Sequence, residues 1–263
     1  MTCIAVIPAR YGASRFPGKP LARKTGKYLI QHVYEQVASC ALIDHVVVAT
    51  DDDRIANAVT EFGGRCAMTR ADHTSGTDRI AEAAESIGLA ENDLVLNIQG
   101  DEPEIEPASI EGMITSFREL EARQQADGVV VTLATPFPET ASSHGNGSPE
   151  DPNCVKVVVR QDGFALYFSR SPIPFPRHSG GVIGEVGAYK LHVGAYGFSM
   201  RTLAAIAAQP RGNWLETHEG LEQLRWMDHG MRLLVRSIPR AAPGIDTPAE
   251  YEAFVRRYEG TLD

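Results

Sequence analysis

The chain has 263 residues, a formal net charge of -9 and an apolar fraction of 43%, which is ordinary for a globular protein large enough to bury a core. This acidic balance argues against general binding to nucleic acid or membrane surfaces, and no apolar run approaches the roughly 20 residues that span a bilayer. The four cysteines have no metal-binding spacing, so we expect reduced thiols in a cytoplasmic protein.

Strand-like and helix-like patterns alternate four times in the first 120 residues. Short apolar runs predict buried strands at 3–9, 45–52, 65–69 and 93–103. Helical spacing and capping residues predict helices at 29–40, 53–64, 75–88 and 107–120, with Ser75 or Thr77 as the cap of the third. This alternation predicts an α/β fold with a Rossmann-like, mostly parallel sheet and helices on both faces.

The pattern changes after residue 120. Strands are predicted at 128–135, 154–163 and 164–170, with a hairpin turn at Gln161-Asp162-Gly163. A loop rich in Gly, Pro and His follows at 172–190. The remaining predicted elements are a strand at 191–199, helices at 201–209 and 215–230, a strand at 231–238 and a helix at 247–260. We expect a single domain over 1–263, in which residues 125–195 form a smaller inserted β-rich lobe.

Positive charge is concentrated between Arg10 and Lys27, and no acidic residue precedes Glu35. The glycines of this loop can shape a turn whose backbone N–H groups approach phosphate. The spacing misses a P-loop, because five residues separate Gly12 from Gly18 and Pro20 follows Lys19. The loop is interpreted as an anion-binding segment, with a solvated basic loop as the alternative.

Acidic residues follow two of the predicted strands and precede the last helix. Asp51, Asp52 and Asp53 come after the second strand, Asp101 and Glu102 come after the fourth, and Asp246 comes before the final helix. Ligands of open parallel sheets bind beyond the carboxyl ends of the strands. Cations beside acids at that edge suggest a polyphosphate bound with a divalent metal.

Several motifs together resemble the sugar-acid cytidylyltransferase family. IPARYGASRFPGKPL is similar to its N-terminal signature, and MTRADHTSGTDRIAE, VLNIQGDEP, LETHEGLEQLR and GIDTPAEYE occur in the family's order over nearly the whole chain. The motifs are most similar to the branch that uses 3-deoxy-manno-octulosonate (Kdo). Phe16 departs from the usual Leu, and the segment 172–195, where the family contacts the sugar acid, is harder to align. An amino-substituted Kdo or a sialic-type sugar acid is therefore an alternative.

The resemblance implies a nucleotidyltransferase-type fold and transfer of CMP from CTP to Kdo, giving CMP-Kdo and pyrophosphate for lipopolysaccharide biosynthesis. It implies Mg²⁺ as cofactor, CTP and the sugar acid as small-molecule substrates, and a homodimer that uses the 125–195 lobe. Catalysis would then be mostly positioning and charge neutralisation.

Under the resemblance, Arg10, Arg15 and Lys19 would hold the triphosphate, and Asp101 with Asp246 would bind Mg²⁺. The catalytic set is therefore expected to be Arg10, Arg15, Lys19 and Asp101. The alternatives are a turn or cap role for Asp101 and an N-cap role for Asp246. The run Asp51 to Asp53 is interpreted mainly as the cap of the following helix.

The implied substrate contacts fall into two groups. The nucleotide would meet Ala9, Arg10, Lys19, Thr74, Ser75, Gly76 and Arg79. The sugar would meet Arg15, Gln99, Arg170, His192, Tyr196, Glu222 and Gln223. A plain helix start at 74–79 and a solvated helix around 222–223 are the alternatives.

Two other functions compete with this prediction. A metal-dependent glycosyltransferase could use Asp51 and Asp53 as a DxD motif after a strand, but the basic loop suits a triphosphate better. A non-catalytic nucleotide sensor would leave the acids at the sheet edge without a purpose.

Overall fold

A computed structural model of the protein describes residues 1–12, 15–145 and 147–260, so residues 13 and 14 of the basic loop lie outside it. The chain divides into two compact units. Unit 1 comprises Met1–Thr115, Gly197–Ala207 and Ala242–Asp263, and unit 2 comprises Ser116–Tyr196 and Ala208–Ala241. Unit 2 includes the 125–195 segment together with 208–241. The single domain with an inserted lobe stays a prediction.

Unit 1 contains a parallel sheet, as the alternating pattern predicts. Its strands are β1 (Cys3–Ala9), β2 (His45–Thr50), β3 (Cys66–Met68) and β4 (Leu94–Asn97), in the order β3-β2-β1-β4. All three pairings are parallel, and the register places Ala9 opposite Thr50. The carboxyl ends of these strands therefore lie at one edge of the sheet.

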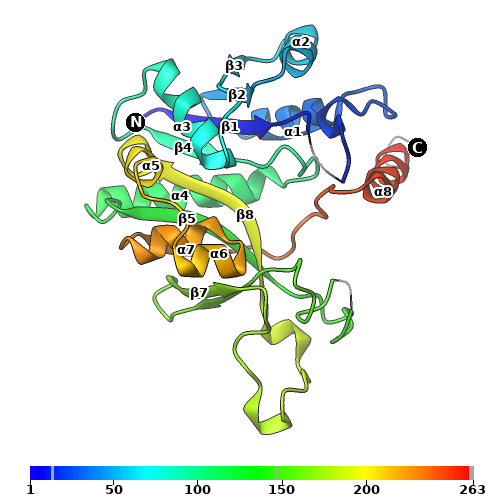
Figure 1. Cartoon of the computed structure of the whole chain (residues 1–263), viewed down its shortest axis with the longest axis vertical. Helices are drawn as coiled ribbons and strands as arrows, with labels where there is room; N and C mark the ends of the chain where they lie inside the picture. The colour runs from blue at the N-terminus through cyan, green and yellow to red at the C-terminus, as the bar shows by residue number, and fades with distance from the viewer. Residues whose placement is uncertain (13–14, 146, 261–263) are drawn as a thin grey trace. The chain divides into compact units, whose positions relative to one another are not determined.

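The helices of unit 1 cover both faces of that sheet. They are α1 (Leu29–Ala38), α2 (Asp53–Glu61), α3 (Gly76–Ile87), α5 (Met200–Ala207) and α8 (Pro248–Glu259), with the short 3-10 turn η1 (Lys19–Leu21). Right-handed crossovers place α1 and α2 on one face, because both connections run in the same direction across the sheet. The connection from β3 to β4 runs back, so α3 lies on the opposite face, where α5 packs beside it (Figure 1).

Three helix starts show why these segments fold as they do. The side chain of Ser75 accepts a hydrogen bond from the Asp78 backbone N–H and caps α3, so Ser75 and not Thr77 is the cap. Asp52 caps α2 in the same way, which confirms the capping interpretation for this acidic run. Thr247 caps α8 in a capping box with Glu250, so the alternative of Asp246 as N-cap is wrong.

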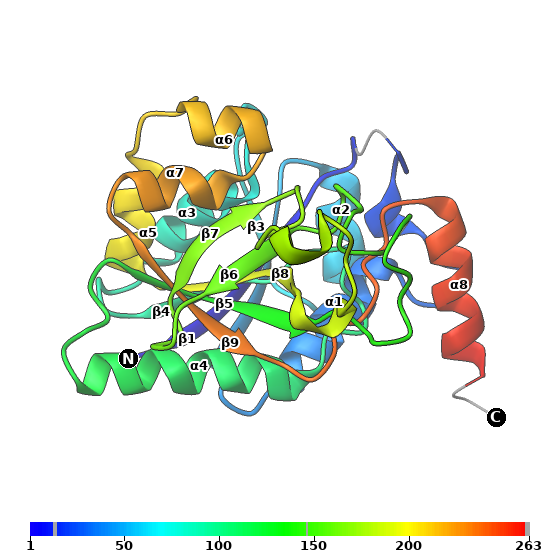
Figure 2. The ribbon, with the colours of Figure 1, turned by 90° about the horizontal axis from the view of Figure 1, so that it is seen from below.

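Unit 2 is richer in antiparallel pairing. Its elements are β5 (Val129–Pro136), β6 (Lys156–Val159), β7 (Ala165–Ser169), β9 (Arg232–Ser237), α6 (Trp214–Glu219), α7 (Glu222–Asp228) and the 3-10 turns η2 (Arg177–Ser179) and η3 (Val186–Ala188). β5 pairs with β9 in parallel, and β6 pairs with β7 as the predicted hairpin (Figure 2). Two elements pass from one unit to the other, namely α4 (Pro107–Ala122) and β8 (Lys190–Ser199).

The single helix predicted at 215–230 is wrong. The structure has two short helices, α6 and α7, which Gly220 separates with a left-handed φ of 61°. This conformation ends α6, and the chain resumes helical geometry only at Glu222. Among the described residues, no helix is both long and apolar enough to cross a membrane.

Candidate functional site

The predicted site residues of unit 1 follow the carboxyl ends of β1, β2 and β4. Arg10 comes after β1, Asp51 after β2, and Asp101 at the turn after β4. That turn passes close to β1, because a Cβ atom added at Gly100 would lie 2.9 Å from the carbonyl oxygen of Pro8. Only glycine fits this approach, and it brings the segment of Asp101 against the segment that leads to the basic loop.

Lys19 is at the centre of the charged site. Its Nζ lies 2.9 Å from Oδ2 of Asp101, 3.4 Å from Oδ1 of Asp246 and 2.7 Å from the carbonyl oxygen of Ile245. Nη2 of Arg15 donates to Oδ2 of Asp246 over 2.9 Å. We call Arg15, Lys19, Asp101 and Asp246 the Lys19 cluster. The structure thus brings two predicted cations and both predicted metal ligands together.

The backbone around Asp246 explains why its carboxylate is available to this cluster. The backbone N–H of Ile245 donates to the carbonyl oxygen of Asp101 over 2.9 Å, which fixes the two acidic segments side by side. Glu250 accepts from the backbone N–H groups of Asp246 and Thr247, each over 2.8 Å. The T-P-A-E sequence at 247–250 carries this capping-box signal, so the N-cap position was readable from the sequence.

Arg10 points to the segment predicted to bind the nucleotide. Its Nη2 donates to the carbonyl oxygen of His73 over 3.2 Å, beside Thr74, Ser75 and Gly76 at the start of α3. The His73 ring contacts the carboxylate of Glu82 from α3, which holds this loop against the helix. Ala9, the last residue of β1, is buried directly before Arg10.

Arg79 and Gln99 lie further inside unit 1. The Arg79 side chain is only 1% exposed, and its Nη1 lies 3.2 Å from Oδ1 of Asp51 and 2.5 Å from Oγ1 of Thr69. Asp51 is thereby the counter-ion of a buried guanidinium, a role that sequence reasoning missed because no local pattern links positions 51 and 79. Gln99 donates from Nε2 to Oδ1 of Asn97 over 3.1 Å.

In unit 2, Arg170 is held by backbone carbonyl oxygens. Its Nε donates to Glu219 over 2.6 Å, its Nη1 to Pro152 over 2.7 Å, and its Nη2 to Gly220 over 3.4 Å. Arg170 therefore fixes the turn that separates α6 from α7. The buried Lys156 ammonium adds a second cation here, because it donates to the carbonyl oxygens of Asp151 and Arg170. Burial lowers the pKa of Lys156.

The other predicted sugar residues of unit 2 form one connected group. The His192 ring packs against the rings of Phe168 and Tyr196, with centroids 4.8 and 5.6 Å away, and Tyr196 packs against Trp226 of α7 at 5.0 Å. Glu222 and Gln223, which begin α7, lie one turn before that tryptophan. Gln223 is 3% exposed, and its Nε2 has no hydrogen-bond partner among the described residues.

Two titratable groups in these regions are strongly perturbed. Burial, together with the neighbouring charge of Asp101, raises the pKa of Glu102 to about 8, so Glu102 is protonated at neutral pH. Burial lowers the pKa of His192 to about 3, so its imidazole is neutral. Since Thr132 donates its hydroxyl proton to the carbonyl of Ala195, its oxygen is free to accept from Nε2–H of His192 at 3.0 Å.

A parallel sheet with a basic loop after its first strand and carboxylates at the same edge is suited to bind a phosphorylated ligand together with a cation. The sequence profile of the cytidylyltransferase family matches residues 4–233. The chain therefore belongs to the cytidylyltransferase family.

Named relatives extend over almost the full chain. A 3-deoxy-manno-octulosonate cytidylyltransferase of Syntrophotalea carbinolica is 46% identical over 95% of this chain and 96% of its own. An 8-amino-3,8-dideoxy-manno-octulosonate cytidylyltransferase of Shewanella amazonensis is 44% identical over 100% of this chain and 99% of its own.

Solved structures agree on the fold. A CMP:2-keto-3-deoxy-manno-octonic acid synthetase complexed with CTP is 39% identical, with a TM-score of 0.86 over 99% of this chain and 100% of its own. A 4-diphosphocytidyl-2C-methyl-D-erythritol synthase of Anaerococcus prevotii is 14% identical, with a TM-score of 0.57 over 98% of this chain and 96% of its own. It shares the fold alone. The predicted nucleotidyltransferase-type α/β fold and the family resemblance are confirmed.

Proposed function

We propose that this protein transfers CMP from CTP to the anomeric hydroxyl of Kdo, for use in lipopolysaccharide biosynthesis. The hydroxyl oxygen attacks the α-phosphorus of CTP, the bond from that phosphorus to the bridging oxygen of the β-phosphate breaks, and pyrophosphate leaves. The observation that carries the proposal is the Lys19 cluster, which gathers two cations and two carboxylates at the sheet edge where such ligands bind.

The basic loop supplies groups suited to a triphosphate. Arg15 and Lys19 lie in the Lys19 cluster, and Arg10 lies beside Thr74, Ser75 and Gly76. The helix start at Gly76 adds backbone N–H groups that favour anions. These groups hold the phosphates and stabilise the negative charge that builds on the leaving pyrophosphate. Ala9 ends β1 directly before Arg10, and Arg79 supports the proposed nucleotide site from inside unit 1 through its ion pair with Asp51.

Asp101 and Asp246 suit a magnesium ion that a nucleotide brings with it. Among the described residues, no three His, Cys, Asp or Glu side chains gather as a metal site, so the protein alone offers two carboxylates. Mg²⁺ is commonly bound by one or two carboxylates together with substrate phosphates and water. The Lys19 ammonium between the two acids supports the fit, since this point already attracts a cation. Bound there, Mg²⁺ would neutralise phosphate charge and lower the pKa of the attacking hydroxyl.

The sugar acid is proposed to contact the connected group of unit 2, which comprises His192, Tyr196, Glu222 and Gln223. The contacts expected for Gln99 and Arg15 of unit 1 stay predictions. The buried, unpaired Nε2 of Gln223 supports a polar ligand at this group, because such an atom costs free energy unless a partner satisfies it. Arg170 supports the group in another way, since its guanidinium fixes the start of α7 through backbone carbonyls.

The second candidate substrate is 8-amino-3,8-dideoxy-manno-octulosonate. It is favoured by a relative of that name that matches the chain end to end at nearly the same identity as the Kdo relative. Both sugars share the carboxylate and the anomeric hydroxyl, so the proposed chemistry is the same for each. They differ at C8, where the amino sugar carries a positive charge at neutral pH.

A homodimer in the cytoplasm completes the proposal. Among its described residues, unit 2 exposes four large apolar side chains, since Leu166, Phe175, Val182 and Trp214 are 57%, 67%, 59% and 69% exposed. Apolar groups exposed in this way favour a protein partner, and a second copy of the chain is the proposed one. Sedimentation velocity on the wild type and on Phe175→Ser tests it: the wild type should sediment as a dimer and the variant should shift towards monomer.

Pyrophosphate release tests the reaction. Each of the four ribonucleoside triphosphates is incubated with Mg²⁺ and either Kdo, the 8-amino sugar or no sugar. Release that requires CTP and Kdo supports the main proposal. Release that requires CTP and the amino sugar identifies the amino sugar as the substrate in place of Kdo. Absence of release with both sugars overturns the proposal. Consumption of a nucleotide sugar in their place would favour a glycosyltransferase.

A further inference from the structure

All the hydrogen-bond donors of the Lys19 ammonium have acceptors within the protein, which a residue that binds only a triphosphate would not need. Its ammonium has three N–H donors, and three acceptors surround it: Asp101, Asp246 and the carbonyl oxygen of Ile245. The Lys19 side chain is 11% exposed, against 30% for Asp101 and 46% for Asp246. The ammonium therefore lies inside the pair of carboxylates and uses all of its donors there.

This position conflicts with the two roles assigned to the cluster. A divalent cation held by Asp101 and Asp246 would lie within a few ångströms of the Lys19 ammonium, where like charges repel strongly. The same ammonium has no donor left for a phosphate oxygen while its three bonds persist. One movement resolves both conflicts, because a cation that takes the carboxylates frees Lys19 for the triphosphate.

We propose that Lys19 is the counter-ion of Asp101 and Asp246 in the free protein, and that a divalent cation displaces it. The inference rests on the proposed function, which supplies the metal and the triphosphate. It assigns Lys19 a regulatory role in addition to phosphate binding: metal binding and release of the ammonium are coupled. Since coupling is reciprocal, a triphosphate that draws Lys19 away also opens the carboxylates to the metal.

If Lys19 has this role, its replacement should raise the affinity of the free protein for a divalent cation. Without the Lys19 charge, Asp101 and Asp246 lose their competitor and the free protein binds a divalent cation more tightly. If Lys19 contacted only the triphosphate, metal affinity without nucleotide would not change. If Lys19 served to hold the two carboxylates in place for the metal, affinity would fall.

The test measures Mn²⁺ binding to nucleotide-free protein. The electron paramagnetic resonance signal of free Mn²⁺ reports how much of the ion stays unbound. Lys19→Met keeps the apolar stem and removes the charge, and we expect it to bind Mn²⁺ about tenfold more tightly than the wild type. The matched control is Lys27→Met, since Lys27 is a lysine of the same basic loop whose Nζ pairs with Glu35, 2.6 Å away, outside the cluster. It should leave Mn²⁺ binding unchanged.

Two further variants locate the effect. Adding Asp101→Asn to Lys19→Met should abolish the gain, because it removes one of the exposed carboxylates. Lys19→Gln can still donate to Ile245 and should show the same gain in Mn²⁺ affinity. It replaces Lys19→Met in the test if the methionine variant is unstable. Equal or weaker Mn²⁺ binding by both Lys19 variants, or a gain that survives Asp101→Asn, overturns the proposal. The Mn²⁺ measurement uses no CTP and no sugar, so its result can be interpreted even if the transferase assay fails.

Discussion

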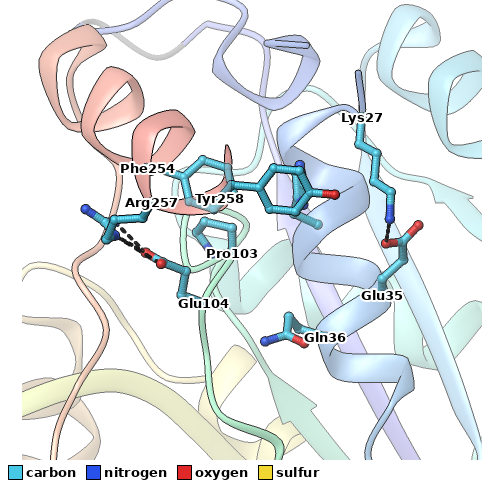
Figure 3. A pocket seen from close by; sticks show the side chains of 9 residues that line it. Lys27, Glu35, Gln36, Pro103, Glu104, Phe254, Arg257 and Tyr258 are labelled. Carbon is cyan, nitrogen blue, oxygen red and sulfur yellow. Dashed lines mark hydrogen bonds and ion pairs between the residues drawn. The ribbon is translucent and has the colours of Figure 1, made fainter. Parts of the chain in front are cut away.

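Arg257 and Glu104 form a two-point ion pair that joins α8 to the turn after β4. Nε of Arg257 lies 3.0 Å from Oε1 and 3.2 Å from Oε2 of Glu104, and Nη2 also contacts Oε2. The pair lies at the wall of a cavity of about 270 Å³ between α1, this turn and α8 (Figure 3). Asp101 lies in the same turn as Glu104, and Asp246 precedes α8, so the pair links the two segments that carry the acids of the Lys19 cluster.

Replacement of Arg257 by Gln is expected to lower the melting temperature by a few degrees. The pair is partly exposed, which limits its worth to about 0.5–1 kcal/mol despite its two-point geometry, and a protein of this size loses roughly 2–4 °C per kcal/mol. Thermal unfolding measures the shift. Arg256→Gln is the control, since Arg256 is an exposed neighbour on the same helix. Equal shifts in both variants would show that the ion pair contributes nothing specific.

Asp101→Asn should reduce turnover with CTP and sugar by about 10²–10³-fold, because it removes one of the two proposed metal ligands at the reacting phosphate. The fold should persist, since the 30% exposed carboxylate fills no core space. Steady-state pyrophosphate release at saturating substrates gives the rate, and circular dichroism confirms folding. Glu119→Gln, at an exposed acid on α4, should be as active as the wild type. A threefold loss or less in Asp101→Asn would contradict the metal role.

Asp51→Asn should destabilise the protein by about 3 kcal/mol, because it leaves the buried Arg79 guanidinium without its counter-ion. Urea unfolding at neutral pH measures this loss. Asp53→Asn is the matched control, since Asp53 lies two residues away, is exposed and acts only in the first turn of α2. It should cost about 0.5 kcal/mol. Comparable losses in the two variants would mean that the Asp51–Arg79 pair is not what stabilises this region.

The sequence allowed much of unit 1 to be predicted, because local patterns determine it. Apolar runs of the right length marked β1, β2 and β4, and alternation with helices implied that their ends share one edge. Lys19 and Asp101 each follow such a strand, so their position at the same edge was predictable. The position of the Lys19 ammonium between Asp101 and Asp246 was not, because side-chain contacts between distant positions leave no local pattern.

Other features stayed out of reach for different physical reasons. Gly220 ends α6, yet a glycine within a helical pattern is often tolerated, so 215–230 looked like one helix. The pairs of Asp51 with Arg79 and Glu104 with Arg257 depend on tertiary packing. Arg170 is an apt residue for binding a carboxylate, but its sequence context carries no sign that backbone carbonyls accept its hydrogen bonds.

His192 should make the protein less stable in mild acid. Burial lowers the pKa of its imidazole from 6.5 to about 3, so between these values the unfolded chain binds a proton that the folded chain does not. The free energy of unfolding therefore falls as the pH drops from about 6.5 towards 3, by at most about 1.4 kcal/mol per pH unit from this group. Above pH 6.5 the ring is neutral in both states and contributes no slope.

His192→Asn isolates this contribution, since asparagine does not titrate and can still hydrogen-bond Thr132. Urea unfolding at pH 5 and pH 7 should show a smaller loss of stability in acid for His192→Asn than for the wild type. Carboxylates add their own pH dependence to both proteins, so the difference between the two slopes is the quantity to compare. His178→Asn is the control, because His178 is exposed and should leave the wild-type slope intact. Identical slopes in the wild type and His192→Asn would mean that the imidazole takes up its proton in the folded protein as readily as in the unfolded chain.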